Sequence, residues 1–202
     1  MTTHYHRCDL PEELTFGPVV AVDTETMGLI PQRDRLCVVQ LSNGDGHCHV
    51  VHLDRSYSCP CLKRILRDPC IRKIFHFARF DLAVLRYHLN VVCMPVYCTK
   101  LASRLVRTNT DHHSLKDLCR DLLGITLQKQ QQMSDWGNDT LTTQQIEYAA
   151  RDVLHLHALK ERLDFLLQRE NRQILAESCF RFLPDRAVLD LMGWDQSDPF
   201  SY

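Results

Sequence analysis

Three short extended segments between residues 19 and 53 constrain the fold more than any other part of this sequence. Residues 19–23 form a run of β-branched and small side chains typical of a buried strand, and similar segments follow at 35–42 and 47–53. The last two are separated only by the turn residues 43–46, Asn-Gly-Asp-Gly. The pattern predicts an antiparallel meander of three strands.

Helical periodicity dominates after residue 60. It predicts a helix ending near residue 68, a short strand at 73–77 followed by a second helix, and a fifth strand within 91–98. The strongest pattern predicts one long helix over about 143–170, which a Thr142–Gln145 capping box begins.

This order of strands first and helices later predicts a single α/β domain over residues 1–202. We expect a catalytic core at about 19–170. We expect the apolar helical tail at about 171–202 to serve packing or oligomerisation.

Composition excludes several classes of protein. With 45% hydrophobic and 24% charged residues the chain is not disordered, and no run approaches about 18 apolar residues, so we expect no membrane span. The N-terminus shows no secretory signal, and the ten cysteines form no regular frame, which favours reduced thiols in the cytoplasm. A net charge of −1 argues against a positive field over the whole surface that would attract long nucleic acid, but it allows a compact local binding site.

An acidic pair closes the first predicted strand. Asp23 and Glu25 are two residues apart, so in a strand both carboxylates point to the same side. Two converging acids repel each other unless a cation lies between them. Alone the pair is a weak signal, because Asp-x-Glu arises by chance about as often as not in a chain this long.

Three further residues can face the same cleft. Asp81 follows the strand at 73–77, where a helix begins, although an aspartate there could simply complement the helix dipole. Tyr148 and Asp152 are four residues apart in the long helix and share a face, which could also be an ordinary polar edge. In combination the four acids and the tyrosine indicate one site.

Clustered carboxylates suit Mg²⁺ or Mn²⁺ rather than zinc. Two such ions about 3.5–4 Å apart can activate water and stabilise the leaving oxygen of a phosphodiester. A tyrosine within hydrogen-bond reach of that water would orient it. The sequence therefore predicts a two-metal site made of Asp23, Glu25, Asp81, Tyr148 and Asp152.

The order Asp-Thr-Glu, then the final aspartate of His-Phe-Ala-Arg-Phe-Asp, then Tyr-x-x-x-Asp resembles the DEDDy class of 3′–5′ exonucleases. Ser-Asp-Trp at 134–136 is similar to the ribonuclease D branch. Within that branch the chain resembles the short nanoRNase C oligoribonucleases at residues 34–42, 129–132, 182–187 and 189–194. The resemblance runs from about residue 20 to 200.

The resemblance implies an RNase H-like fold, with a mixed sheet of three antiparallel and then parallel strands flanked by helices. It also implies a homo-oligomer, an octamer in this family, with short RNA as partner and no membrane. Ribonuclease D carries further helical RNA-binding domains, and we expect no such accessory domain here.

Residue roles carry over from the resemblance. Asp23, Glu25 and Asp152 would hold the first metal, Asp23 would bridge to the second, and Asp81 would support that second ion. Tyr148 would position the water. Leu29 matches the place where the family uses an apolar wedge against the terminal bases.

Outside these motifs, His76 could touch substrate or be a packed strand-end histidine. Cations for a substrate phosphate could come from residues 100–107 or 111–116.

Strand alternation puts His47 and His49 on one face and Cys48 on the other, so these three do not form one zinc site. We expect a solvated basic face from Lys63, Arg64, Arg67, Arg72 and Lys73. Trp136 is either a buried anchor or a stacking platform for a base.

We therefore expect a two-metal 3′–5′ exoribonuclease that hydrolyses short oligoribonucleotides, favouring dinucleotides, to nucleoside 5′-monophosphates. One alternative keeps the chemistry and changes the substrate to longer RNA 3′ ends or DNA. A second alternative is a non-catalytic nucleotide-binding scaffold, which would have no need for all five motif residues.

Overall fold

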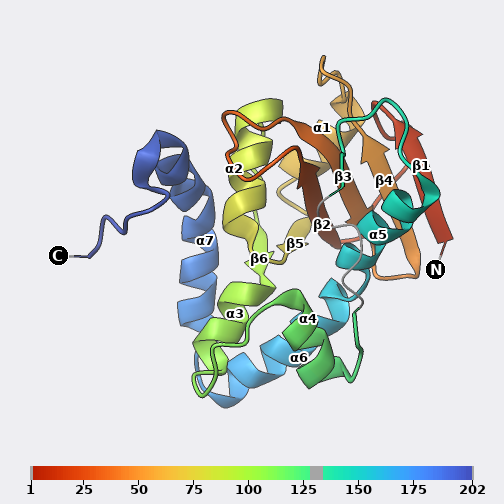
Figure 1. Cartoon of the computed structure of the whole chain (residues 1–202). Helices are drawn as coiled ribbons and strands as arrows, with labels where there is room; N and C mark the ends of the chain where they lie inside the picture. The colour runs from red at the N-terminus through yellow and green to blue at the C-terminus, as the bar shows by residue number, and fades with distance from the viewer. Residues whose placement is uncertain (1, 128–133, 202) are drawn as a thin grey trace.

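A computed structural model describes residues 2–127 and 134–201, so the 129–132 motif lies outside the described residues. The strands within that part of the chain are β1 (Thr2–Arg7), β2 (Val19–Thr26), β3 (Leu36–Ser42), β4 (His47–His52), β5 (Arg72–Phe75) and β6 (Val96–Cys98). They form one sheet in the order β1-β4-β3-β2-β5-β6 (Figure 1).

Pairing in the sheet confirms the predicted meander. β2 pairs with β3 and β3 with β4, both antiparallel, whereas β5 joins β2 and β6 joins β5 in parallel. The sequence pattern did not predict β1, which adds a parallel edge strand beside β4. Its polar sequence alternates between the two faces of the sheet and lacks the apolar run that identified the other strands.

The helices lie around this sheet. The α-helices in the described part of the chain are α1 (Pro60–Arg67), α2 (Ala78–Leu89), α3 (Thr99–Val106), α4 (Leu115–Leu118), α5 (Thr143–Leu154), α6 (Leu156–Arg169) and α7 (Gln173–Leu189). Short π-helical turns follow α4 at Cys119–Leu123 and α7 at Asp190–Trp194. No helix in residues 2–127 and 134–201 has the length and apolar character that crossing a membrane requires.

The prediction of one long helix over 143–170 is wrong, because the chain breaks at His155 into α5 and α6. The Thr142–Gln145 capping box is present as predicted. The two halves have different partners: α5 packs against β1 to β4, whereas α6 packs against α3 and β5. The helix axis therefore turns at His155 while the apolar periodicity continues through it.

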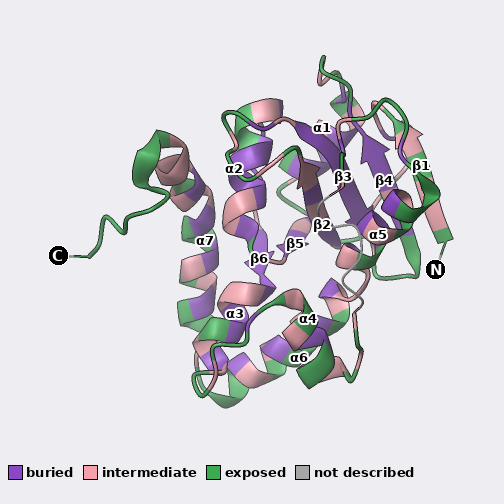
Figure 2. Ribbon diagram, in the orientation of Figure 1, coloured by how far each residue is buried: buried purple, intermediate pink, exposed green. Residues whose placement is uncertain are grey.

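The core lies between the sheet and its helices, where the purple segments of Figure 2 mark buried residues of β2, β3, β4 and α2. α7 packs along α2 and contacts β6, so the first part of the predicted tail belongs to the body of the molecule. All ten cysteines are unpaired, and Cys37 and Cys119 are among the buried ones.

The predicted basic face is wrong at Lys73, whose side chain is completely buried in β5. Its Nζ donates hydrogen bonds to the carbonyl oxygens of Asp68, Ile71 and Met94, at 2.6, 2.7 and 2.8 Å. Three acceptors replace the water that the ammonium loses, which makes a buried lysine tolerable. Burial lowers the pKa of Lys73.

Candidate active site

The acidic pair lies where the sequence predicts, near the end of β2, and α5 brings a third carboxylate to it. Asp23 and Glu25 alternate with Thr24 along the strand. Asp152 belongs to the last turn of α5, which packs against β2. The ligand oxygens of Asp23, Glu25 and Asp152 all lie within 4.8 Å of one another. These three form the carboxylate triad.

Asp81 lies in the first turn of α2, buried beside the triad. Thr24, whose neighbours in β2 are the two triad acids, donates a hydrogen bond from Oγ1 to Asp81 Oδ1 at 2.7 Å. The charge of Asp81 acts on both Asp23 and Glu25. Asp81 is therefore close enough to share the electrostatics of the triad without being one of its three converging ligands.

The electrostatics of this site are unfavourable without a cation. Burial is the main cause that raises the pKa of Asp23, followed by repulsion from Asp81, Asp152 and Glu25. The pKa of Glu25 is raised well above its ordinary value by burial and by Asp152 and Asp81. Four acids packed this way resist ionising together, and a divalent cation would relieve the repulsion.

The other two acids follow the same direction. Burial raises the pKa of Asp81 to about 7, against the hydrogen bond from Thr24 that lowers it. Burial also raises the pKa of Asp152 to about 6, while a hydrogen bond from Tyr148 acts in the opposite sense. The donor set is made of oxygens alone, so the residues present fit Mg²⁺ or Mn²⁺.

Tyr148 lies one turn before Asp152 on α5. Burial and the negative charges of Asp152, Glu25 and Asp23 raise its pKa, so its phenol stays protonated and can donate a hydrogen bond at neutral pH. Its ring lies 6.2 Å from the ring of Trp136, centroid to centroid. Trp136 is buried, which favours a buried anchor over a stacking platform for a base.

A cavity of about 420 Å³ opens beside the triad. It is lined by Asp23, His76, Phe77, Lys100, Ser114, Leu115, Lys116, Leu127, Tyr148 and Asp152. A slightly larger hollow of about 490 Å³ lies at α6 and α7, away from these carboxylates, with the Arg72–Glu177 ion pair in its wall. The smaller cavity is the one that the triad residues Asp23 and Asp152 line, together with Tyr148, Lys100 and Lys116.

The two residues just before α2 and a lysine of α3 form one wall of the cavity. His76 Nδ1 is 2.9 Å from Thr99 Oγ1, and burial together with the charge of Lys100 lowers the pKa of His76 to about 3. Lys100 Nζ lies 4.1 Å from the ring centroid of the exposed Phe77. The wall therefore offers a neutral imidazole, an aromatic face and one ammonium group.

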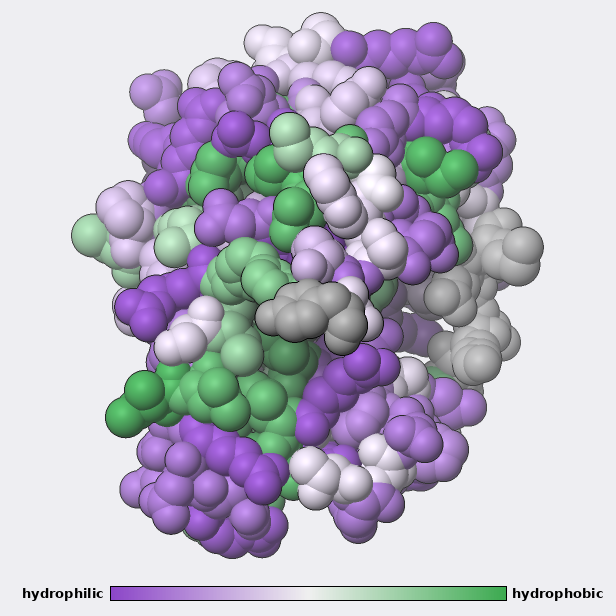
Figure 3. All heavy atoms as spheres, turned by 90° about the vertical axis from the view of Figure 1, so that its left-hand side faces the viewer, coloured by the Kyte–Doolittle hydropathy of each residue, from purple (hydrophilic) through white to green (hydrophobic). Residues whose placement is uncertain are grey.

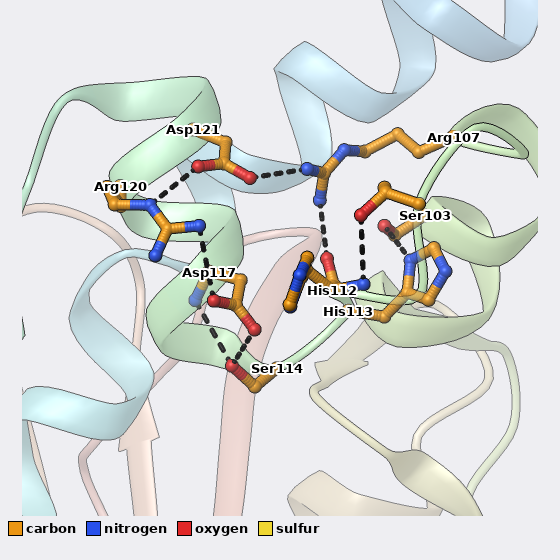
Figure 4. Close-up of polar contacts among 9 residues, drawn as sticks. Ser103, Arg107, His112, His113, Ser114, Asp117, Arg120 and Asp121 are labelled. Carbon is orange, nitrogen blue, oxygen red and sulfur yellow. Dashed lines mark hydrogen bonds and ion pairs between the residues drawn. The ribbon is translucent and has the colours of Figure 1, made fainter.

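A polar network surrounds Ser114, one of the cavity-lining residues (Figure 4). Ser114 caps α4 by accepting the backbone N–H of Asp117 at 3.2 Å and donating to its carboxylate at 2.5 Å. Arg120 pairs with Asp117 and Asp121, and Arg107 with Asp121. Arg107 also donates to the carbonyl of His112 at 2.9 Å. The guanidinium of Arg107 is thus engaged in the network, while Ser114 and Lys116 line the cavity.

Three of the motif residues, Asp23, Tyr148 and Asp152, line this cavity together with His76. Glu25 completes the triad, and Asp81 is buried next to it. Leu29 lies elsewhere. Leu29 is 82% exposed in the loop after β2 and is not among the cavity-lining residues. Its role as a wedge stays a prediction. The sequence pattern did not identify Thr24 or Phe77. The position of Thr24 between the two acids could have indicated its role. Phe77 depends on a turn in which its own φ is 68°, and no local pattern identified that turn.

The sequence and the fold are similar to those of known nucleases. A family model described as 3′–5′ exonuclease matches residues 3–168. Ribonuclease D of Granulibacter bethesdensis is 32% identical over 155 residues, 77% of this chain and 39% of that protein. The chain thus spans less than half the length of the curated ribonuclease D proteins that it matches.

The solved structures include one protein similar over its whole length. NrnC of Brucella melitensis is 50% identical, with a TM-score of 0.94 and complete coverage of both chains. The same protein has been solved with bound Mg²⁺ at 49% identity and a TM-score of 0.93, covering both chains completely. Bound to pGG, it again gives 49% identity and a TM-score of 0.93, covering 100% of this chain and 99% of that one. These matches confirm the predicted RNase H-like exonuclease fold.

Proposed function

The chain belongs to the 3′–5′ exonuclease family, and from this membership we propose that it hydrolyses short RNAs from their 3′ ends to nucleoside 5′-monophosphates. The observation that carries the proposal is the carboxylate triad, with Asp81 beside it, at a cavity that Asp23, Asp152 and Tyr148 line. Full-length similarity to NrnC supports the short substrate, since the longer ribonuclease D proteins match over less than half of their length.

Each side chain has a role in this proposal. Asp23, Glu25 and Asp152 would hold one divalent cation, and Asp23 would also contribute to a second ion that Asp81 would support. When bound, the two ions activate the attacking water and stabilise the charge on the phosphate and the leaving 3′-oxygen. Tyr148, protonated beside the triad, donates its hydroxyl hydrogen bond to orient that water. Thr24 fixes the rotamer of Asp81 through its 2.7 Å hydrogen bond.

The cavity walls support a dinucleotide as the favoured substrate. A molecule with one linkage and a 5′-phosphate needs only a few local cations, and Lys100 and Lys116 line the cavity beside Ser114. The chain as a whole carries a net charge of −1. NrnC of Brucella melitensis bound to pGG supports the same substrate length. We propose that His76 contacts the substrate and that Leu29 packs against its terminal base.

A substrate-length series tests this function. The protein is incubated with Mg²⁺ or Mn²⁺ and 5′-labelled RNAs of two to about ten nucleotides, with a matched DNA set, and nucleoside 5′-monophosphate release is measured. We expect the dinucleotide to be cleaved fastest. Rates that rise with length, or equal rates on DNA, would replace the short-RNA role by that of a general exonuclease.

Two variants separate enzyme from scaffold in this assay. Asp23→Asn removes one triad charge at constant shape and should lower turnover by orders of magnitude. Glu13→Gln removes an exposed carboxylate elsewhere and should change nothing. Turnover absent from the unaltered protein with either metal would favour the non-catalytic nucleotide-binding scaffold.

We also propose that the chain works as a homo-oligomer, an octamer by its resemblance to the family. An apolar area on the face that includes α7 supports association (Figure 3). Large apolar side chains exposed on α7 and beyond it are Ile174, Leu175, Phe182, Met192, Trp194 and Phe200. Light scattering of Ile174→Glu should show a smaller assembly than Thr108→Glu, which alters an exposed polar residue. An unchanged mass would exclude this face.

Residues 1–202 would act as a single exonuclease domain, with the part beyond α7 contributing to assembly. We place this domain in the cytoplasm, because ten unpaired thiols, several of them buried as small apolar groups, suit a reducing compartment. Fractionation of the producing cell should find it with cytoplasmic markers.

A further inference from the structure

Four histidines form a continuous row on β1 and β4. The parallel pairing of these strands sets His4 and His6 beside His47 and His49. Successive ring centroids along the row His6, His49, His4, His47 are 5.3, 4.8 and 5.3 Å apart, with rings 15–19° from parallel. These four residues are named the imidazole ladder.

The ladder lies on the face of the sheet opposite the carboxylate triad. Residues directly across a strand pair share a face, and Asp23 lies across from Gln40 in β3. Gln40 lies across from Val50 in β4, and Val50 from Tyr5 in β1. Tyr5 therefore points to the triad face, and its neighbours His4 and His6 point to the other. The ladder is thus separate from the proposed nuclease site.

Ring nitrogens form hydrogen bonds in two cross-strand pairs. His4 Nε2 is 3.1 Å from His47 Nδ1, and His6 Nε2 is 3.0 Å from His49 Nδ1. Two imidazole nitrogens on one cation, each at about 2.1 Å, are separated by about 3.0–3.4 Å for bond angles between right-angled and tetrahedral. A cation can therefore replace the hydrogen-bonded proton of either pair with little change in spacing, and the proton moves to the other nitrogen of its ring or to water.

The ladder is accessible to solvent from one end. Phe16 packs edge-on against His49, with ring centroids 5.6 Å apart, so the His6–His49 pair is the more enclosed of the two. His47 is exposed and leaves the other end open to solvent.

We propose that the imidazole ladder binds a transition-metal cation such as Ni²⁺, Cu²⁺ or Zn²⁺ through the His4–His47 pair, with His6–His49 as a second, more enclosed pair. Across residues 2–127 and 134–201, only the carboxylate triad brings three ligand atoms together within 4.8 Å, so each ladder pair supplies two nitrogens and water completes the coordination. Imidazole suits these metals, whereas Mg²⁺ prefers the oxygens of the triad. Since β1 joins the sheet through β4 alone, a cation bound between the two strands also stabilises the pairing of β1 with β4.

Nickel titration tests the proposal without reference to catalysis. Calorimetry with Ni²⁺ is done on the full chain carrying Asp23→Asn, in excess Mg²⁺, so that the triad does not contribute. We expect saturable binding that His47→Gln weakens by about a hundredfold, the gain that a second preplaced ligand gives. His112→Gln, an exposed histidine outside the ladder, should bind as tightly as its parent. Equal affinity in His47→Gln, or no binding in the parent, overturns the proposal.

A second measurement uses the unaltered ladder and so does not depend on a variant's folding. Paramagnetic Ni²⁺ added to the same protein should broaden the imidazole resonances of His4 and His47 first and those of His6 and His49 next. Broadening that begins at His112 or His155, with the ladder resonances unchanged, overturns the assignment.

Discussion

Replacing Asp23 by asparagine should stabilise the metal-free protein and at the same time remove its catalysis. The oxygens of Asp23 lie within 4.8 Å of those of Glu25 and Asp152. Asparagine preserves the shape of the side chain and removes one negative charge from this group. The substitution therefore isolates electrostatic repulsion from packing.

The magnitude follows from this geometry. Two unit charges 4.8 Å apart repel by about 3.5 kcal/mol at an effective dielectric constant of about 20. The raised pKa values of Asp23 and Glu25 mean that bound protons already relieve part of this repulsion. We therefore expect a net gain near 2 kcal/mol, which raises the Tm of a chain this size by about 4–8 °C.

Thermal unfolding near pH 8 measures the effect, first with a chelator and then with Mg²⁺. The wild-type protein should gain about 2.7 kcal/mol when Mg²⁺ reaches a hundred times its Kd, whereas Asp23→Asn should gain far less. Glu13→Gln is the matched control and should follow the wild type in both conditions. A variant less stable than wild type in chelator, yet equally stabilised by Mg²⁺, would refute the reasoning.

Four further results are expected. The carboxyl groups of the triad and Asp81 have higher pKa values in the folded than in the unfolded chain, so the folded protein binds more protons. This contributes stability at low pH, which is lost as pH rises through about 4 to 7. Unfolding of the metal-free protein measured against pH should show this loss, and Mg²⁺ should reverse it. Tyr148→Phe should lower kcat by about 10²–10⁴-fold while Mg²⁺ still raises the Tm, and loss of both would contradict a water-orienting role. Lys73→Met should cost about 3 kcal/mol in urea unfolding, since three carbonyl groups lose their donor; a cost below about 1 kcal/mol would refute that account. Leu29→Ala should raise KM for the dinucleotide and leave the Tm unchanged, because Leu29 is 82% exposed, whereas an unchanged KM would exclude the wedge.

The central meander and the acidic positions could be predicted because both depend on short-range spacing. Strand alternation sets Asp23 and Glu25 on one side, and one helical turn joins Tyr148 to Asp152. Local patterns could not predict the break at His155, because α5 and α6 continue one apolar periodicity while packing against different partners. Only the tertiary structure distinguishes these partners.

The remaining differences arise from contacts between distant segments. β1 pairs with β4 across about forty residues, and its polar side chains gave no hydrophobic signal. Lys73 is buried because carbonyl oxygens of two connections, Asp68 and Ile71 before β5 and Met94 before β6, surround its ammonium group. Likewise, the cavity wall formed by Phe77 and Lys100 joins the start of α2 to the start of α3, which the sequence keeps apart.

The most direct test of the proposed metal-dependent chemistry replaces one non-bridging oxygen of the scissile phosphate in an RNA dinucleotide by sulfur. Mg²⁺ binds sulfur poorly, whereas the softer Mn²⁺ accepts it better. The proposed site at Asp23, Glu25 and Asp152 predicts that one thio-diastereomer is cleaved slowly with Mg²⁺ and that Mn²⁺ restores the rate. Equal slowing of both diastereomers with either metal would contradict direct contact between the bound ions and the phosphate.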